Sequence, residues 1–151
     1  MWGARQRLQG RIDRLLVHAR GTTDDELQAE LARYLCILVS SLIEERCRER
    51  ASAFADSRSA PELVRFVRAQ TKRFRSPSSG NIRDFFCGFD PARANGWYDG
   101  LAYDQRDALD SIAANRNQLA HGASVGLSLG RLASYTDRAG NAMRELDRQF
   151  G

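Results

Sequence analysis

The segment RNQLAHG, residues 116–122, holds the side chains best suited to chemistry in this sequence. Arg116 follows Leu109 by seven positions, so on a helix it lies in line with apolar residues, where an arginine is costly unless it meets an anion or a carboxylate. Asn117 and His121 are four positions apart and share a helix face. Residues that break a local pattern in this way are enriched in functional sites. We therefore treat Arg116, Asn117 and His121 as candidate site residues.

The same spacing suggests acid–base chemistry on RNA. His121 falls in the last turn of the expected helix, where the helix dipole favours an imidazolium, and Gly122 lets the backbone turn away from an accessible ring. A histidine that moves protons, beside an arginine that stabilises charge on phosphate oxygens, suits attack by a ribose 2′-hydroxyl on the adjacent phosphodiester. No cluster of carboxylates or histidines at metal-ligand spacing accompanies the segment. We therefore expect neither a cofactor nor a metal.

Structural interpretations of these residues stay open beside the chemical one. Arg116 could be a buried arginine that pairs with Glu44 or Glu45, and the two roles can coexist. His121 could be a helix-end residue that donates to the last backbone carbonyls. Glu44 and Glu45 directly follow the longest apolar block, where acidic residues usually begin the solvated part of a helix. The residues alone therefore leave Arg116 structural, catalytic or both.

The composition indicates one folded domain of 151 residues, 1–151. The chain has 23 Lys and Arg against 19 Asp and Glu, a formal net charge of +4, and 42% hydrophobic residues, which excludes a disordered or fibrous chain. This mild charge excess does not by itself indicate nucleic-acid binding. Three widely spaced cysteines, Cys36, Cys47 and Cys87, indicate packed thiols rather than a disulfide framework or a zinc site.

The sequence carries no sign of a membrane segment or an export signal. Its first 20 residues lack the apolar stretch of a signal peptide, and its longest apolar block, residues 34–43, is too short to span a bilayer. We therefore expect a soluble cytoplasmic protein with no membrane partner.

Apolar residues recur at helical spacing along the whole chain, and no strand-like alternation is present. The pattern predicts an all-α bundle of about five to six helices around a long, central second helix. The expected helices span residues 2–20, 24–56, 59–74, 81–89, 101–121 and 129–150, with a brief turn after Asp90. The expected N-caps are Thr22 or Thr23, Ser59 and Ser128. The aromatic residues expected in the core are Phe85, Phe86, Trp97 and Tyr98.

The segment SIAANRNQLAHG, residues 111–122, resembles the signature of HEPN domains. These all-α modules carry an arginine, usually a polar neighbour, and a histidine about four to six positions later. Other segments resemble the RiboL-PSP-HEPN group; they are residues 35–37, 42–45, 67–70, 73–74, 89–91 and 127–129 with Leu132 and Tyr135. The resemblance spans residues 27–150, and the first helix, within residues 1–20, lies outside it.

The resemblance implies a bundle that dimerises so that two Arg/His motifs face each other across a shared cleft. In active members this arrangement forms a metal-independent endoribonuclease, frequently in toxin–antitoxin, anti-phage or CRISPR-associated systems. Carried over to this sequence, Arg116 would bind the scissile phosphate and His121 would be the acid/base. Asn117 would orient them, and Glu44 or Glu45 would support the arginine.

Three functional hypotheses follow. The first, which the complete motif favours, is a homodimeric ribonuclease that acts on RNA as a toxin or anti-phage effector, with an antitoxin or defence protein as a further partner. The second is a non-catalytic HEPN module that binds nucleotide, RNA or a partner protein. The third is a plain helical interaction domain in which Arg116 is structural. Ala123 stands where some toxin members carry a tyrosine that a partner enzyme modifies, so we do not expect that control.

Overall fold

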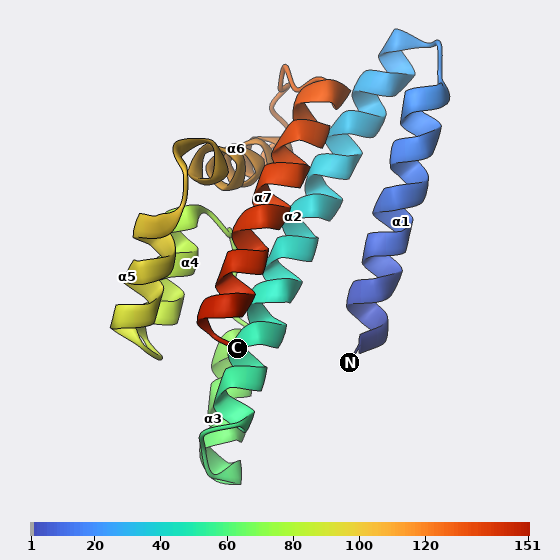
Figure 1. The fold of residues 1–151 in the computed structure, drawn as a ribbon. Coiled ribbons are helices and arrows are strands. Elements are labelled where there is room, and N and C mark those ends of the chain that lie inside the picture. The colour runs from blue at the N-terminus through green and yellow to red at the C-terminus, as the bar shows by residue number, and fades with distance from the viewer. Residues whose placement is uncertain (1) are drawn as a thin grey trace.

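The computed structural model describes residues 2–151, which form seven α-helices and no strand (Figure 1). The all-α prediction is confirmed, although the described residues form one helix more than the five to six expected. The helices are α1 (Trp2–Gly21), α2 (Asp25–Asp56), α3 (Pro61–Thr71), α4 (Ser79–Cys87), α5 (Pro91–Gly100), α6 (Tyr103–Ala120) and α7 (Leu129–Gln149). The extra helix is α5, because Asp90 caps ten helical residues rather than a brief turn. Its Ala94 and Trp97 are buried in the core, so packing carries the helix through Gly96.

The 32-residue α2 is the centre of the bundle, as its apolar middle predicts. Helices α1, α3, α6 and α7 all pack against it. Helices α4 and α5 pair with each other and rest against α6 and α7. Figure 1 shows α1 on the opposite side of α2 from the α4–α5 pair. The central helix therefore separates α1 from the part of the molecule that holds the candidate motif.

Two predicted helix caps are wrong, and the neighbouring chemistry explains why. Asp24, not Thr22 or Thr23, caps α2, and its Oδ1 accepts the backbone N–H groups of Glu26 and Leu27 at 3.0 and 3.1 Å. A carboxylate favours the positive end of the helix dipole more than a hydroxyl does. Helix α3 begins after Ala60 without a side-chain cap, so Ser59 lies outside it, and it ends at Thr71 rather than Phe74. Ser128 caps α7 as predicted.

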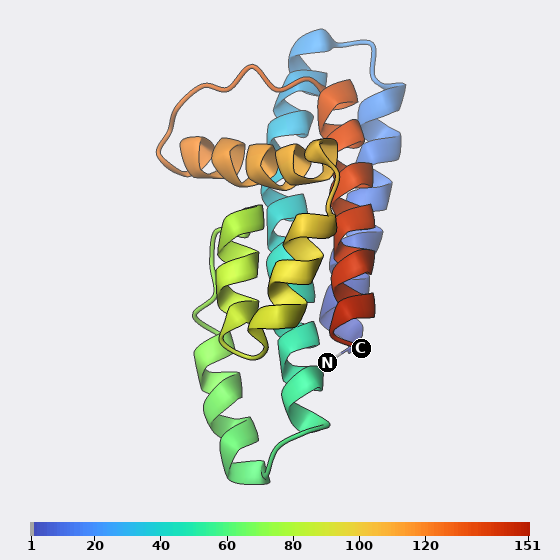
Figure 2. The same ribbon diagram turned by 60° about the vertical axis from the view of Figure 1, so that its left-hand side comes forward.

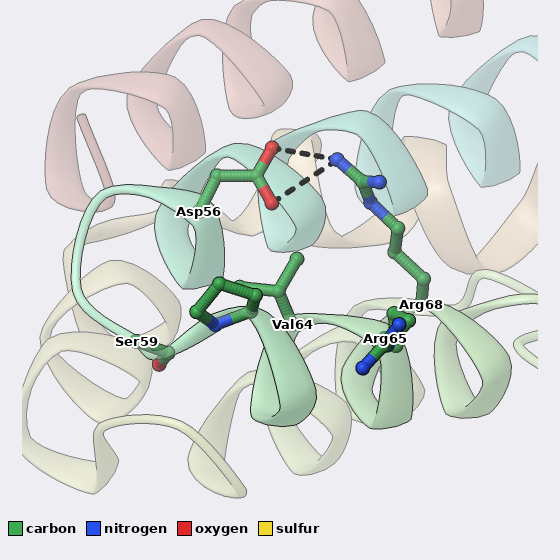
Figure 3. A pocket seen from close by; sticks show the side chains of 6 residues that line it. Asp56, Ser59, Val64, Arg65 and Arg68 are labelled. Atoms are coloured by element: carbon green, nitrogen blue, oxygen red, sulfur yellow. Dashed lines mark hydrogen bonds and ion pairs between the residues drawn. The ribbon is translucent and has the colours of Figure 1, made fainter.

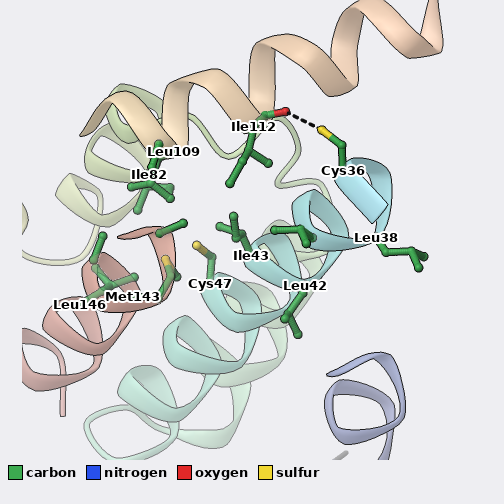
Figure 4. Packing of buried hydrophobic residues seen from close by; sticks show 14 of the residues in the cluster. Cys36, Leu38, Leu42, Ile43, Cys47, Ile82, Leu109, Ile112, Met143 and Leu146 are labelled. Carbon is green, nitrogen blue, oxygen red and sulfur yellow. Dashed lines mark hydrogen bonds between the residues drawn. The ribbon is translucent and has the colours of Figure 1, made fainter. Parts of the chain in front are cut away.

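The core lies where α2, α4, α6 and α7 meet (Figure 4). Cys36 and Cys47 are packed thiols, and the Cys36 Sγ donates to the carbonyl of Ile112 at 3.7 Å. Burial raises the pKa of the Cys36 thiol to about 11 and raises that of Cys47 further. Trp97 is buried, and its indole N–H donates to the carbonyl of Ala142 at 2.9 Å.

Of the four aromatic residues expected in the core, two reach it fully. Trp97 and Phe86 are buried, whereas Phe85 and Tyr98 are half-buried. The predicted burial of Tyr98 is therefore wrong in degree: its ring lies beneath two arginines at the edge of the bundle. None of the helices over residues 2–151 combines the length and the apolar character that crossing a membrane would need.

Helix α6 lies across the long axes of α2 and α7, and its C-terminal half extends beyond α2 (Figure 2). Leu109 and Ile112 in its middle are buried, at 0% and 1% exposure. Beyond them Arg116 is half-buried and His121 is exposed. The end of α6 therefore leaves the core and carries the motif to the edge of the molecule.

Candidate functional site

The end of α6 is fixed by its own backbone. His121 is the C-cap residue, and Gly122 adopts a φ of 76°, the left-handed conformation that glycine tolerates best. The N–H of Gly122 donates to the carbonyl of Leu119 at 3.1 Å, and that of Ala123 donates to Gln118 at 3.0 Å. These two bonds form a Schellman motif, which satisfies the last carbonyls of the helix. The His121 ring is therefore placed at a defined helix end and exposed.

The ring of His121 makes no hydrogen bond with the described residues, so the interpretation that it donates to the last carbonyls is wrong. Arg116 likewise has no carboxylate partner within residues 2–151, and the predicted pair with Glu44 or Glu45 does not form. Both carboxylates instead pair with Arg48 on their own helix, with N···O distances of 3.3 Å. The side chains of Arg116 and His121 are therefore available to a ligand or a partner.

Glu44 nevertheless connects to the motif through a residue that the sequence did not single out. Its carboxylate is buried, and Oε1 accepts the backbone N–H of Ser76 at 3.2 Å. The Ser76 hydroxyl accepts from the Asn117 side-chain amide at 3.0 Å. A chain of hydrogen bonds therefore runs from Arg48 through Glu44 and Ser76 to Asn117. Glu44 acts on the position of Asn117 rather than on the charge of Arg116.

Ser76 holds this position in an uncommon backbone conformation. Its φ is 58°, the one positive φ among non-glycine residues that the structure describes. Positive φ in a residue with a Cβ costs energy and persists where its surroundings hold it. The Asn81 amide donates to the Ser76 carbonyl at 2.8 Å, which adds a third tie beside Glu44 and Asn117. Local sequence signalled only a loop here, because two of the three ties, those to Glu44 and Asn117, come from distant segments.

The chain before Ser76 brings positive charge to the same place. Lys72, Arg73 and Arg75 are exposed, and none of them has a carboxylate partner in the described part of the chain. One Arg75 nitrogen donates to the carbonyls of Lys72 and Phe74 at 2.7 and 2.8 Å. Arg48 also donates to the Phe74 carbonyl at 2.8 Å. The loop beside the motif is therefore cationic and suited to an anionic ligand. Hydrogen bonds from arginine side chains to its backbone carbonyls hold it in place.

Two hollows lie outside the motif. One, of about 310 Å³, lies between α3 and the end of α2, where one Arg68 nitrogen bonds both Asp56 oxygens (Figure 3). The other, of about 420 Å³, lies between α1, α2 and α7 and includes Arg46, Leu42 and Met143. Neither includes a residue of the motif. Within residues 2–151 no three His, Cys, Asp or Glu side chains converge as metal ligands would.

The described residues form an all-helical bundle in which a transverse helix ends in Arg-Asn-x-x-x-His, and neither Arg116 nor His121 has a side-chain partner among them. The model of the RiboL-PSP-HEPN family matches residues 6–151. The chain therefore belongs to the RiboL-PSP-HEPN family, a HEPN module associated with nucleotides or RNA. The match includes most of α1, which the resemblance seen in the sequence left out. Neither the curated proteins nor the solved structures compared with the chain gave a match.

Proposed function

We propose that this protein is a metal-independent endoribonuclease of the HEPN type. His121 accepts the proton of the attacking 2′-hydroxyl. A histidine then donates a proton to the leaving 5′-oxygen, and this is either the same ring or the His121 ring of a second copy of the chain. Arg116 binds the scissile phosphate and stabilises the charge that develops on its oxygens. Asn117, held through Ser76 by Glu44, orients the phosphate between them. The 2′-hydroxyl forms a bond to phosphorus as the bond to the 5′-oxygen breaks, which leaves a 2′,3′-cyclic phosphate.

The observation that carries this proposal is that Arg116 and His121 have no side-chain partner in the part of the chain that the structure describes, whereas many other charged residues do. Eleven ion pairs occupy many charged groups of residues 2–151, yet Arg116 is not in one of them and the exposed His121 has no bonded partner. The Arg116 side chain is half-buried, and none of its nitrogen atoms is a buried atom without a partner, so its guanidinium is open to an anion from solvent. A bound phosphate would supply the missing partner and place itself beside the histidine.

We further propose that the working unit is a homodimer in which two α6 ends share one cleft. A single motif offers one histidine and one arginine, whereas a two-fold axis supplies both groups on each side of a phosphate. The surface beside the motif suits such an interface, because the apolar Ile37 of α2 is 36% exposed. Ile37 lies two turns before Glu44 on the same face of α2. A strict monomer at tens of micromolar in light scattering would contradict this arrangement.

A toxin or anti-phage role in the cytoplasm, with an antitoxin or defence protein as partner, is our proposal for the biological setting. It rests on the settings in which active HEPN ribonucleases occur. Induced expression in bacterial cells should then arrest growth, and the His121→Ala variant should not. Growth arrest by both proteins would separate toxicity from cleavage and contradict the proposal.

The test of the activity uses purified wild-type protein, His121→Ala and the matched control His18→Ala with mixed tRNA and messenger RNA. His18 is the other histidine of the chain and is exposed on α1. We expect cleavage by wild type and His18→Ala, in the presence of EDTA, with 2′,3′-cyclic phosphate and 5′-hydroxyl ends in mass spectrometry. DNA and 2′-O-methyl RNA should stay intact, because both lack the nucleophile. A 3′-hydroxyl with a 5′-phosphate would contradict the mechanism, and full activity of His121→Ala would contradict the site.

A further inference from the structure

Tyr98 of α5 carries two arginines from two other helices on its ring. The guanidinium carbon of Arg83, from α4, lies 4.4 Å from the ring centroid, and that of Arg106, from α6, lies 4.2 Å from it. Both distances are within the range of a cation–π contact. Three helices therefore hold two positive charges at one place on the surface.

These two guanidiniums retain hydrogen-bond donors. The Arg106 Nε donates to the Tyr98 carbonyl at 3.1 Å, and this arginine has no carboxylate partner among the described residues. Arg83 directs Nε and Nη2 to one oxygen of Asp84 at 3.2 and 3.1 Å, and its other terminal nitrogen has no acceptor there. The ion pair of Arg83 with Asp84 at 3.1 Å leaves Arg83, Asp84 and Arg106 together with one net positive charge, which a bound anion would neutralise. The free N–H edges suit the oxygens of phosphate.

The pair lies in register with the proposed cleavage motif. Arg106 precedes Asn117 by eleven residues, which is three helical turns, so both lie on one face of α6. The helical rise separates them by about 16 Å. Asp110 lies between them on this face, and its Oδ1 accepts both the backbone N–H and the hydroxyl of Ser79 at 2.8 Å. This carboxylate is therefore engaged with the first turn of α4.

We propose that Arg83 and Arg106, supported by the Tyr98 ring, form a second anchor for the phosphates of single-stranded RNA, a few nucleotides from the cleaved bond. The inference rests on the proposed ribonuclease function, since it extends the substrate along α6 from that site. The anchor reads the backbone and not the bases, because both guanidiniums cover the ring that a base would otherwise stack on. It selects substrates by length on one side of the cleavage position.

The binding test removes the two charges in a protein that cannot cleave. In a His121→Ala background, Arg83→Gln with Arg106→Gln is compared with Arg11→Gln, measured by fluorescence anisotropy on a long single-stranded RNA over a range of salt concentrations. Arg11 is a control for the loss of a guanidinium from an aromatic ring, because it lies 5.3 Å from the Tyr34 ring on the α1 side of the molecule. We expect the double change to weaken binding roughly tenfold and to flatten the salt dependence by about 0.7 for each phosphate that the variant no longer neutralises. The control should retain wild-type values.

A cleavage test separates the anchor from the active site. This test uses the Arg83→Gln, Arg106→Gln protein that retains His121. A dinucleotide that spans only the cleaved bond should react at the wild-type rate. A long RNA should show a raised KM and an unchanged kcat. Equal affinity and salt dependence in the double variant and the control would show that RNA does not bind these arginines, and the proposed anchor would be wrong. An acidic protein surface would then be the remaining candidate ligand of the two arginines. Absence of cleavage by wild type, with a weakened salt dependence in the double variant, would overturn the ribonuclease and retain RNA binding here. Thermal unfolding of each variant verifies that the fold is intact.

Discussion

Two regions, the α2–α7 seam and the end of α6, use arginine in opposite ways. In the seam, Asp147 pairs with Arg46 at 3.3 Å and with Arg50 at 3.2 Å. The Arg46 side chain is only 12% exposed; its burial lowers its pKa, and Asp147 opposes that shift. At the end of α6, Arg116 and His121 have no such partner among the described residues.

The difference shows where the fold has used its charges and where it has left them available. In the seam one carboxylate of α7, Asp147, bonds two guanidiniums of α2, so removal of that carboxylate would leave both without their charge partner. At the end of α6 the helix cap places His121, and a hydrogen bond to Ser76 places the neighbouring Asn117. Changes in the seam should therefore affect folding with little effect on cleavage, and changes at the end of α6 should do the reverse.

The largest expected effect is the loss of cleavage in His121→Ala. Removal of a proton-transfer group should lower the cleavage rate by roughly 10²–10⁴-fold. The free energy of unfolding should stay within about 0.5 kcal/mol of wild type, because the ring is exposed and has no bonded partner. Initial rates on RNA and urea unfolding of the same preparations measure both quantities. A large loss of stability in His121→Ala would contradict the expectation that changes at the end of α6, unlike changes in the seam, leave folding unaffected.

The second effect is a loss of stability in Asp147→Ala. This change leaves Arg46 and Arg50 without their shared carboxylate, and charge-assisted hydrogen bonds contribute about 1.5–3 kcal/mol each when partly buried. Urea unfolding should show a loss of that order, while the cleavage rate per folded molecule stays unchanged. Asp137→Ala is the control, because Asp137 lies exposed on the same helix. A slower reaction in folded Asp147→Ala protein would join the two regions that we separate.

An intermediate effect tests the link from Glu44 to the motif. Ser76→Ala and Ser76→Gly both remove the hydroxyl that accepts from Asn117, so both should slow cleavage by roughly tenfold. The glycine variant should be more stable than the alanine variant by about 1 kcal/mol, because glycine tolerates the φ of 58°. Rates that differ between the two variants would show that backbone strain, and not the hydroxyl, governs the site.

The smallest effect concerns the reactivity of the three thiols, of which Cys36 and Cys47 are buried and Cys87 is half-buried. Burial holds the pKa of Cys36 at about 11, above its ordinary value of 9.0, and raises that of Cys47 in the same direction. Iodoacetamide should therefore modify the half-buried Cys87 first at pH 8 and spare the other two until unfolding. The stabilisation from burying the neutral Cys36 thiol is complete below pH 9 and declines as the pH rises toward 11. Peptide mass spectrometry after timed labelling checks this order.

The parts of the fold that could be predicted from the sequence depend on residues close together in the chain. Helices α2, α6 and α7 follow from apolar periodicity, and the end of α6 follows from Gly122. The partner of Glu44 was also within reach: Arg48 stands four positions later on the same helix, where a Glu–Arg pair is favourable. An arginine on another helix had to compete with that neighbour.

The rest of the site depends on long-range contacts that no local pattern encodes. Ser76 meets Glu44 and Asn117, which are 32 and 41 positions away, and its positive φ is imposed by those contacts. Tyr98 looks apolar in the sequence, yet Arg83 and Arg106 converge on it from two other helices. Periodicity predicts which face of a helix is buried; it does not predict which polar groups meet where helices cross.

The position of α1 has a consequence for how the molecule opens. This helix packs against α2, on the side away from the motif, and its Ile12 and Ala19 enter the core there. A segment attached along one neighbour can detach while the remaining helices stay packed, so α1 should behave as a separate cooperative unit. Backbone amides of residues 2–20 would then exchange with deuterium sooner than those of α2, and each opening would bare Leu42 to solvent without disturbing the end of α6.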